Sequence, residues 1–225
     1  MMIKLVGVTK KFDSMTLLKN FSVSFTEDEI TCLFGPSGVG KTTIANIAAR
    51  LVSVDEGIVT GTENAVYSYV FQEPRLLPWY SVYDNIDFVL RDVYDDHKRK
   101  HVIESCLEMV ELSGSRDYKP AALSGGMAQR VSIARAFAYP SNVLIMDEPF
   151  KGLDMKLKQE MISLFKNLWN ENKKTVIFIT HDVDEAVYLS HTIYIIKNRP
   201  VEIVSTVDVE KTEDMESIKK ILLSV

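Results

Sequence analysis

The feature that most constrains the fold is a short apolar run that leads directly into a glycine-rich loop. Residues Ile30–Phe34 have the length and composition of a buried strand, and the loop Gly35–Thr42 follows without a break. A helical pattern then covers Thr42–Arg50. A strand, a glycine loop and a helix in this order begin a strand–helix–strand unit, so we expect parallel strands in one sheet with helices over its faces.

The same alternation of strands and helices continues along the chain. Apolar runs predict buried strands at Val143–Met146 and Val176–Thr180, and the amphipathic stretch Met155–Trp169 between them predicts a helix. Two earlier runs, Ile3–Val8 and Phe21–Phe25, predict strands near the N-terminus. The chain therefore reads as an α/β protein with a sheet core.

A second lobe is predicted inside this core. After a strand at Tyr67–Phe71, residues 81–138 keep mostly helical spacing before the strand pattern returns at Val143. No repeat, low-complexity segment or long Gly/Ser linker divides the sequence. We therefore expect one domain with an inserted helical segment.

Composition excludes several classes of protein. The 225 residues include 26 Lys+Arg and 31 Asp+Glu, and the net charge of −5 argues against a nucleic-acid partner. Cys32 and Cys106 lie far apart without CxxC spacing, so neither a disulfide framework nor a zinc site is expected. No apolar run approaches the ~18 residues of a membrane span. We expect a cytoplasmic protein that reaches a membrane only through a partner, without an extra C-terminal regulatory domain.

The glycine loop carries a phosphate-binding motif. Gly35-Pro36-Ser37-Gly38-Val39-Gly40-Lys41-Thr42 fits G-x-x-x-x-G-K-[ST] between a strand and a helix, which is the context that this motif requires. The glycines let backbone N–H groups turn toward phosphate oxygens, and the helix N-terminus adds partial positive charge. Lys41 is expected to reach the β- and γ-phosphates, and the Thr42 hydroxyl is expected to bind Mg²⁺.

Two acids follow the next buried strand. Asp147 and Glu148 come directly after Val143–Met146, at the carboxyl end of the strand, which is where open α/β sheets bind ligands. Asp147 is expected to hold Mg²⁺ through water. Glu148 is then placed to orient or deprotonate an attacking water, a contribution of roughly 10²–10⁴ in rate.

A further motif narrows the class of NTPase. The stretch Leu123-Ser124-Gly125-Gly126-Met127-Ala128-Gln129-Arg130 lies between the phosphate loop and the Asp147-Glu148-Pro149 strand end. It resembles the signature of ABC-type ATPases, and the resemblance covers nearly the whole chain. It implies a P-loop NTPase of ABC ATPase type, with a mixed-sheet core and an inserted helical subdomain. In that family a RecA-like core with N-terminal antiparallel strands would cover 1–72 and 140–225, and the helical subdomain 73–139.

The resemblance also implies a site residue by residue. Gln72 is similar to the glutamine that senses Mg²⁺ and the attacking water, and His181 to the histidine that contacts the γ-phosphate. Asp154 matches an aspartate that communicates across a dimer. Phe12 stands where the family stacks an aromatic on adenine, although a core position is the alternative. The catalytic residues expected are Lys41, Gln72, Glu148 and His181; the metal ligands are Thr42, Gln72 and Asp147; the ATP-binding residues are Phe12, Gly35, Pro36, Ser37, Gly38, Val39, Gly40, Lys41, Thr42, Thr43, Ser124, Gly125, Gly126 and Asp154.

The resemblance to ABC-type ATPases also implies that a second copy of the chain is a partner. Two phosphate-facing helix N-termini in one chain imply a homodimer in which the signature Ser124-Gly125-Gly126 of each copy closes on ATP held by the other. A simple helix cap is the alternative for this signature.

One stretch is most similar to a particular group of importers. Residues 71–86 resemble ATPases of importers for nitrate, sulfonates, taurine and thiamine precursors, and residues 180–186 and 198–200 are similar to the same group. This implies a peripheral subunit on the cytoplasmic side of the membrane, with a separate permease gripped within 73–95 and an extracytoplasmic solute-binding protein. The alternative is a soluble ABC ATPase without a transport role.

Overall fold

The computed structural model describes residues 2–212 and 215–223. These residues form two compact units, each assembled from separate parts of the chain. The first unit comprises Met1–Tyr67, Asn142–Glu148 and Lys173–Val225, and the second comprises Ser68–Ser141 and Pro149–Asn172. The subdomain boundaries inferred from the sequence stay a prediction, and in the structure the segment Pro149–Asn172 groups with the helical unit.

A mostly parallel sheet forms the centre of the first unit. Its strands lie in the order β6-β7-β3-β8-β9, and only β9 runs antiparallel to its neighbour. Every residue of β3 and β7 is buried, as expected where helices cover both faces of a sheet. The bounds are β3 Ile30–Phe34, β6 Val143–Asp147, β7 Thr175–Thr180, β8 Thr192–Lys197 and β9 Glu202–Asp208.

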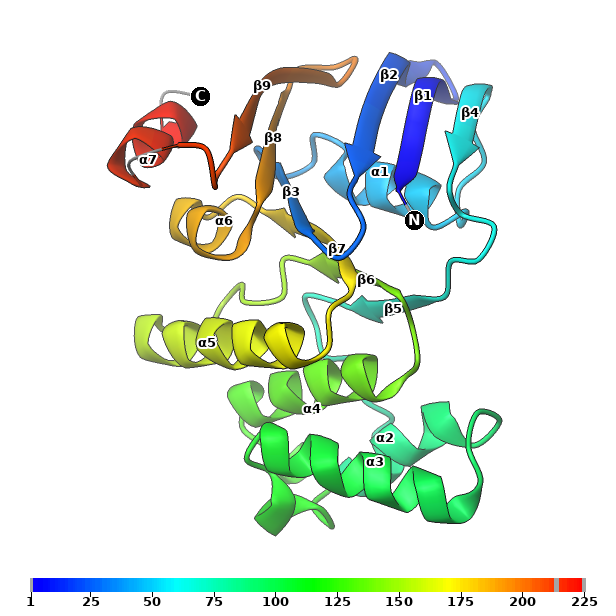
Figure 1. Ribbon diagram of the computed structural model, residues 1–225, viewed down its shortest axis with the longest axis vertical. Coiled ribbons are helices and arrows are strands. Elements are labelled where there is room, and N and C mark those ends of the chain that lie inside the picture. The colour runs from blue at the N-terminus through cyan, green and yellow to red at the C-terminus, as the bar shows by residue number, and fades with distance from the viewer. Residues whose placement is uncertain (1, 213–214, 224–225) are drawn as a thin grey trace. The chain divides into compact units, whose positions relative to one another are not determined.

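A second sheet stands at the N-terminal part of this unit. Strands β1 (Ile3–Phe12), β2 (Met15–Phe25) and β4 (Glu56–Thr60) pair antiparallel in the order β2-β1-β4, and α1 (Lys41–Ala48) packs against β1 (Figure 1). The sequence underestimated the length of β1, which continues as far as Phe12. It also missed β4, a short strand that contains Gly57 at a φ of 87° and that pairs with the distant β1.

Two short helices complete the first unit. Helix α6 (Val183–Leu189) follows β7, and α7 (Met215–Leu223) packs on it, with Lys219 Nζ 2.8 Å from Asp184 Oδ1. Both cysteines are buried thiols outside any disulfide, Cys32 in this unit and Cys106 in the second. Burial raises the pKa of the Cys32 thiol well above its ordinary value. The thiols therefore belong to the core.

Helices dominate the second unit. Helices α2, α3 and α4 pack on one another, and α5 packs on α4 through Phe137 and Phe165, whose ring centroids are 5.9 Å apart (Figure 1). The N-terminus of α2 is fixed by a capping box between Ser81 and Asp84. The bounds are β5 Tyr67–Val70, which begins at the unit boundary, α2 Val82–Leu90, α3 Asp96–Met109, α4 Gly125–Ala138 and α5 Met155–Glu171, with 3-10 turns at Ser113–Ser115 and Pro120–Ala122.

Helix length and hydropathy bear on membrane insertion. Across the described ranges 2–212 and 215–223, no helix combines the length and the apolar character needed to cross a bilayer.

Candidate functional site

Parallel pairing brings the loops that follow β3, β6 and β7 to one edge of the central sheet. Phe34 at the end of β3 pairs with Thr180 of β7, and Asp147 at the end of β6 pairs with Ile179 of β7. The residues that follow these strands, Gly35, Glu148 and His181, therefore emerge from the same sheet edge. Local sequence predicted each strand end, and the register places them together.

The glycine loop has the conformation needed to hold an anion. Gly38 and Gly40 adopt φ values of 76° and 125°, which L side chains rarely reach. A Cβ on Gly35 would lie 2.3 Å from the carbonyl oxygen of Ile196, so only glycine fits there. Helix α1 begins after Gly40, and no side chain caps its first turn. Its leading N–H groups therefore point into the loop, where a phosphate can accept from them.

Lys41 is held inside this loop. Its side chain is buried, and Nζ donates to the carbonyl oxygens of Gly35 at 2.7 Å and Pro36 at 2.9 Å. A buried ammonium requires such partners because loss of hydration is costly. The same ammonium can exchange a carbonyl for a phosphate oxygen without leaving the loop. This arrangement agrees with the role predicted for Lys41.

A candidate metal site lies between the loop and β6. The Thr42 hydroxyl donates to Asp147 Oδ2 at 2.8 Å, although 105 positions separate the two residues. Hydroxyl and carboxylate oxygens are hard donors of the kind that Mg²⁺ prefers, either directly or through water. The donor set therefore fits Mg²⁺, and the structure brings together the two ligands predicted in this unit.

Glu148 and His181 form a pair beside the loop. The distance between His181 Nδ1 and Glu148 Oε1 is 3.3 Å, and the glutamate side chain is largely buried whereas that of the histidine is about half exposed. Glu148 has a φ of 45°, a conformation that costs about 1–3 kcal/mol for a non-glycine residue. Its backbone N–H donates to Ile179 O at 2.9 Å, which holds this turn on β7. Strain of this kind concentrates at functional sites.

A cavity of about 190 Å³ joins these elements. Glu148 and Ile179 face the glycine loop across it, so an anion bound on α1 would lie beside the glutamate. The residues that line it are Gly38, Gly40, Lys41, Thr42, Thr43, Glu148 and Ile179.

A ring of hydrogen bonds supports the turn that contains His181. The Thr180 hydroxyl donates to Glu185 Oε2 at 2.6 Å and accepts from the Asp182 N–H at 3.0 Å. Asp182 Oδ1 in turn accepts from the Glu185 N–H at 3.0 Å, which caps α6. The sequence had assigned no role to Thr180 or Glu185. The available signal in the sequence was that Glu185 is followed directly by the apolar Ala186 and Val187, which are buried with it.

The second unit presents a helix N-terminus at the signature residues. Ser124 caps α4 by accepting from the Met127 N–H at 3.2 Å, and a Cβ on Gly125 would meet nothing within 4 Å. A Cβ on Gly126 would come within 2.7 Å of Leu157, so this glycine lets α5 approach α4. Ser124 is a helix cap here, and the open side at Gly125 leaves the helix N-terminus accessible to an anion.

Asp154 and Gln72 also belong to the second unit. Asp154 caps α5 by accepting from the Leu157 N–H at 3.0 Å, and Gln72 is exposed directly after Phe71. Sequence reasoning missed the buried Gln129, whose Nε2 donates to Pro149 O at 2.6 Å and to Phe71 O at 3.4 Å. It thereby ties the signature helix to Phe71, which precedes Gln72, and to Pro149, which follows Glu148.

Phe12 lies at the end of β1 in the first unit. Its side chain is 42% exposed, and Lys10 Nζ lies 5.2 Å from the ring centroid. An exposed ring at a strand end is free to stack on a planar ligand, so the core alternative for Phe12 does not hold.

A parallel sheet that ends in a glycine loop, a Thr–Asp pair and a Glu–His pair is the arrangement of a P-loop nucleoside-triphosphate-binding protein. Comparison with known proteins narrows this class. The sequence pattern of the family described as ABC transporter matches residues 18–151. More than half of the chain is covered, and the chain therefore belongs to the ABC transporter family.

Relatives within the family are import subunits. The aliphatic sulfonates import ATP-binding protein SsuB 1 of Pseudomonas savastanoi pv. phaseolicola is 41% identical over 191 residues, covering 85% of this chain and 78% of that protein. The SsuB of Bacillus subtilis is 36% identical over 222 residues, covering 93% and 86%.

A solved structure is similar over most of its length. The dimeric post-hydrolysis cassette MJ0796 bound to ADP and Pi is 31% identical, with a TM-score of 0.77, and covers 92% of this chain and 98% of its own. The chain is thus an ATP-binding importer subunit and an ATPase with the ABC ATPase fold. The importer interpretation is confirmed over the soluble alternative.

The hydrogen bonds among Thr180, Asp182 and Glu185 support the turn that contains His181, and they can be tested by mutation. Replacing Thr180 by Val removes the hydroxyl that links Asp182 and Glu185 but keeps the shape of the side chain. We expect kcat for ATP hydrolysis to fall about fivefold to tenfold while KM changes less than about twofold, because the phosphate loop is untouched.

Steady-state phosphate release measures both constants for this comparison. Thr180→Ser should recover kcat, and Asp184→Asn, which alters the exposed contact with Lys219 but not the ring, should resemble the wild type. A folded Thr180→Val protein with unchanged kcat would show that the ring does not position His181.

Proposed function

We propose that this chain hydrolyses MgATP in the cavity between the glycine loop and Glu148, and that hydrolysis drives import of a small solute through a separate permease. The observation that carries this proposal is the pairing of Thr42 with Asp147 and of Glu148 with His181 around one phosphate loop. A phosphate loop alone would support nucleotide binding. The added acids and histidine supply what hydrolysis requires.

The loop binds and orients the phosphates. The leading N–H groups of α1 donate to the phosphate oxygens, and Lys41 exchanges its bonds with Gly35 and Pro36 for bonds to the β- and γ-phosphates. Thr42 and Asp147 would hold Mg²⁺, and the resemblance of the sequence makes Gln72 a further candidate ligand. The ion, when bound, neutralises charge on the β- and γ-phosphates. Phe12 stacks on the adenine.

Glu148 acts on the attacking water. Its carboxylate accepts a proton from the water as the oxygen bonds to the γ-phosphorus, and the bond from that phosphorus to the bridging β–γ oxygen breaks. His181, held 3.3 Å from Glu148, donates a hydrogen bond to the γ-phosphate. The products are ADP and inorganic phosphate, and the left-handed turn at Glu148 aims the carboxylate into the cavity.

A second copy completes each site. The α4 N-terminus at Ser124, Gly125 and Gly126 closes on the γ-phosphate held by the other copy, and Asp154 communicates between the copies. The open side at Gly125 and the capped geometry of Ser124 support this assignment. The relative MJ0796 is described as dimeric with ADP and Pi. The functional unit is therefore a homodimer with ATP between the two copies.

An aromatic cluster in the second unit is the permease contact. Trp79 is 65% exposed, its ring lies 6.3 Å from that of Tyr80, and Tyr80 lies 5.9 Å from the exposed Phe88. The buried Asn85 fixes the backbone beneath them by bonds to Leu77, Tyr80 and Ser81. A rigid, exposed aromatic surface suits a partner helix.

The import role defines the remaining partners. The chain lies peripherally on the cytoplasmic side of the membrane, bound to its permease, and an extracytoplasmic solute-binding protein delivers the solute. The named relatives import aliphatic sulfonates. A sulfonate or another small solute of the nitrate, taurine or thiamine-precursor type is therefore the transported class, selected by the binding protein and the permease.

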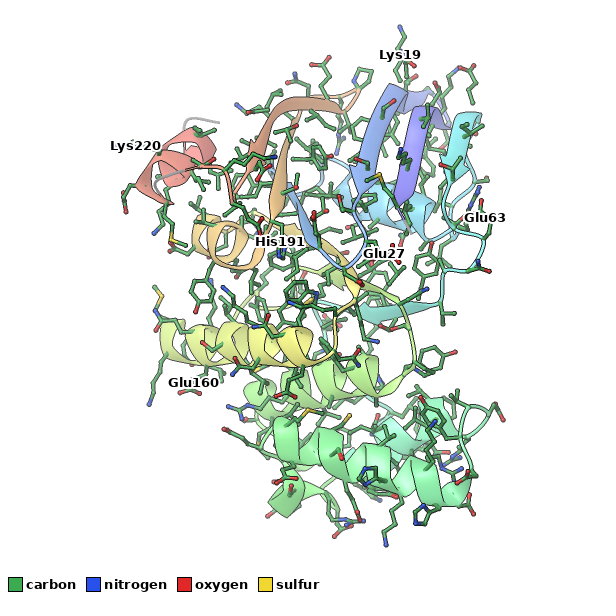
Figure 2. All side chains as sticks on the ribbon, viewed as in Figure 1. Lys19, Glu27, Glu63, Glu160, His191 and Lys220 are labelled. Atoms are coloured by element: carbon green, nitrogen blue, oxygen red, sulfur yellow. The ribbon has the colours of Figure 1, made fainter. Side chains whose placement is uncertain are left out.

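Substitution of Lys41 tests whether the glycine loop supports ATP hydrolysis. Lys41→Ala removes the only side-chain cation of the phosphate motif, and we expect hydrolysis to fall at least about a hundredfold. Lys19→Ala is the matched control because Lys19 extends outward from β2 (Figure 2). Phosphate release by both purified variants is the measurement. Wild-type turnover in Lys41→Ala would refute the assignment of the loop.

The dimer is tested by slowing hydrolysis. Glu148→Gln keeps the size of the side chain but cannot accept the proton, so the ATP-bound dimer should accumulate. Gel filtration with MgATP should show a dimer for Glu148→Gln and a smaller species after nucleotide removal. A variant that binds MgATP yet stays monomeric contradicts closure by a second copy.

The permease contact is tested by co-purification. Trp79→Ala should reduce recovery of the permease from detergent-solubilised membranes at least about tenfold, since exposed aromatic anchors carry most of an interface's binding energy. Leu51→Ala, equally exposed at 70% but in the first unit, should not. Normal permease recovery with a folded Trp79→Ala protein would place the contact elsewhere.

A further inference from the structure

The connection between β8 and β9 lies directly behind the phosphate loop. The carbonyl oxygen of Ile196 stands 2.3 Å from the position of a Cβ on Gly35, and Val201 Cγ2 stands 3.2 Å from that on Gly40. The Val201 N–H donates to Leu17 O at 2.8 Å, which joins this connection to β2. Residues Ile196–Val201 therefore back the loop at its first and last glycines.

Arg199 reaches the middle of the loop from this connection. Its Nη2 donates to the carbonyl oxygen of Gly38, and its Nη1 lies 3.8 Å from Met15 Sδ at the start of β2. The contact with Gly38 spans 161 positions of sequence. One guanidinium thus links the phosphate loop to the hairpin that carries Phe12.

We infer that Arg199 is a positioning residue for nucleotide phosphates, acting through the Gly38–Val39 peptide. This peptide is planar and trans, so its carbonyl oxygen and its N–H point in opposite directions. A guanidinium that holds the Gly38 carbonyl on the outer side of the loop directs the Val39 N–H inward. That N–H makes only a long contact, 3.4 Å, with Pro36 O, and a phosphate oxygen can replace it.

The charge of Arg199 acts in the same direction. The cationic guanidinium lies on the loop that receives a polyphosphate. The carboxylate of Glu202, the first residue of β9, accepts from Asn198 Nδ2 at 3.2 Å. The orientation of the Val39 N–H and the charge of Arg199 stabilise the bound phosphates equally before and during hydrolysis. Arg199 therefore lowers KM and leaves kcat nearly unchanged.

This inference rests on the proposal that Gly35–Thr42 binds the nucleotide, and the experiment separates the two. Calorimetric titration with ADP and with ATP, and steady-state hydrolysis, are measured on the full chain for Arg199→Ala, Arg199→Lys and Lys41→Ala. Glu202→Gln, at the start of β9, serves as the control. Circular dichroism confirms that each variant is folded.

We expect Arg199→Ala to weaken ADP and ATP binding and to raise KM about tenfold, with kcat within about twofold of the wild type. Arg199→Lys, which keeps the charge but not the planar fork, should recover part of the affinity. Wild-type affinity in Arg199→Ala, or an equal loss of kcat in both Arg199 variants, would overturn the inference. Unchanged ADP binding in Lys41→Ala would instead refute the nucleotide site itself.

Discussion

The parallel register between β3, β7 and β6 is the constraint on which the remaining site geometry depends. Phe34 pairs with Thr180, and Ile179 pairs with Asp147, so three chain segments leave the sheet at one edge. A one-residue slip in either pairing would turn the side chains of a strand to the opposite face and shift the residues that follow the strand out of line with their neighbours. The buried aliphatic side chains of β3 and β7 resist such a slip. Packing in the sheet therefore fixes the distances between the loop, Glu148 and His181.

Helix N-termini provide the anion-binding groups in both units, but they are prepared differently. Gly40 precedes α1 without any side-chain cap, which leaves the first-turn N–H groups to a ligand. Ser124 precedes α4 and caps it, while the adjacent Gly125 keeps the approach open. The uncapped N-terminus of α1 suits tight binding of phosphates. The capped N-terminus of α4 suits a contact that forms and breaks as two copies associate.

Local patterns in the sequence predicted much of the fold and the site. The strand Ile30–Phe34, the glycine loop and the acids after Val143–Met146 each carry their information within a few residues, and the structure has them as predicted. The strand β4 was missed because its residues pair only with the distant β1. The left-handed turn at Glu148 was missed because glutamate gives no local signal for a positive φ.

Contacts over long sequence separations account for the other omissions. The Thr180–Asp182–Glu185 ring depends on the burial of Glu185, and Arg199 meets Gly38 only through tertiary packing. Gln129 was visible within the signature stretch, yet its partners Phe71 and Pro149 lie far away along the chain. A single sequence shows that these polar residues are present, but it does not show which distant residues they contact.

The most direct test of the account is phosphate release from ATP by the purified wild-type chain, measured over a series of ATP and protein concentrations with and without a chelator of divalent cations. The account predicts saturable hydrolysis that ceases on chelation and a rate per chain that rises with protein concentration as dimers form. A folded protein that releases no phosphate, or that hydrolyses ATP equally well in the chelator, would contradict it.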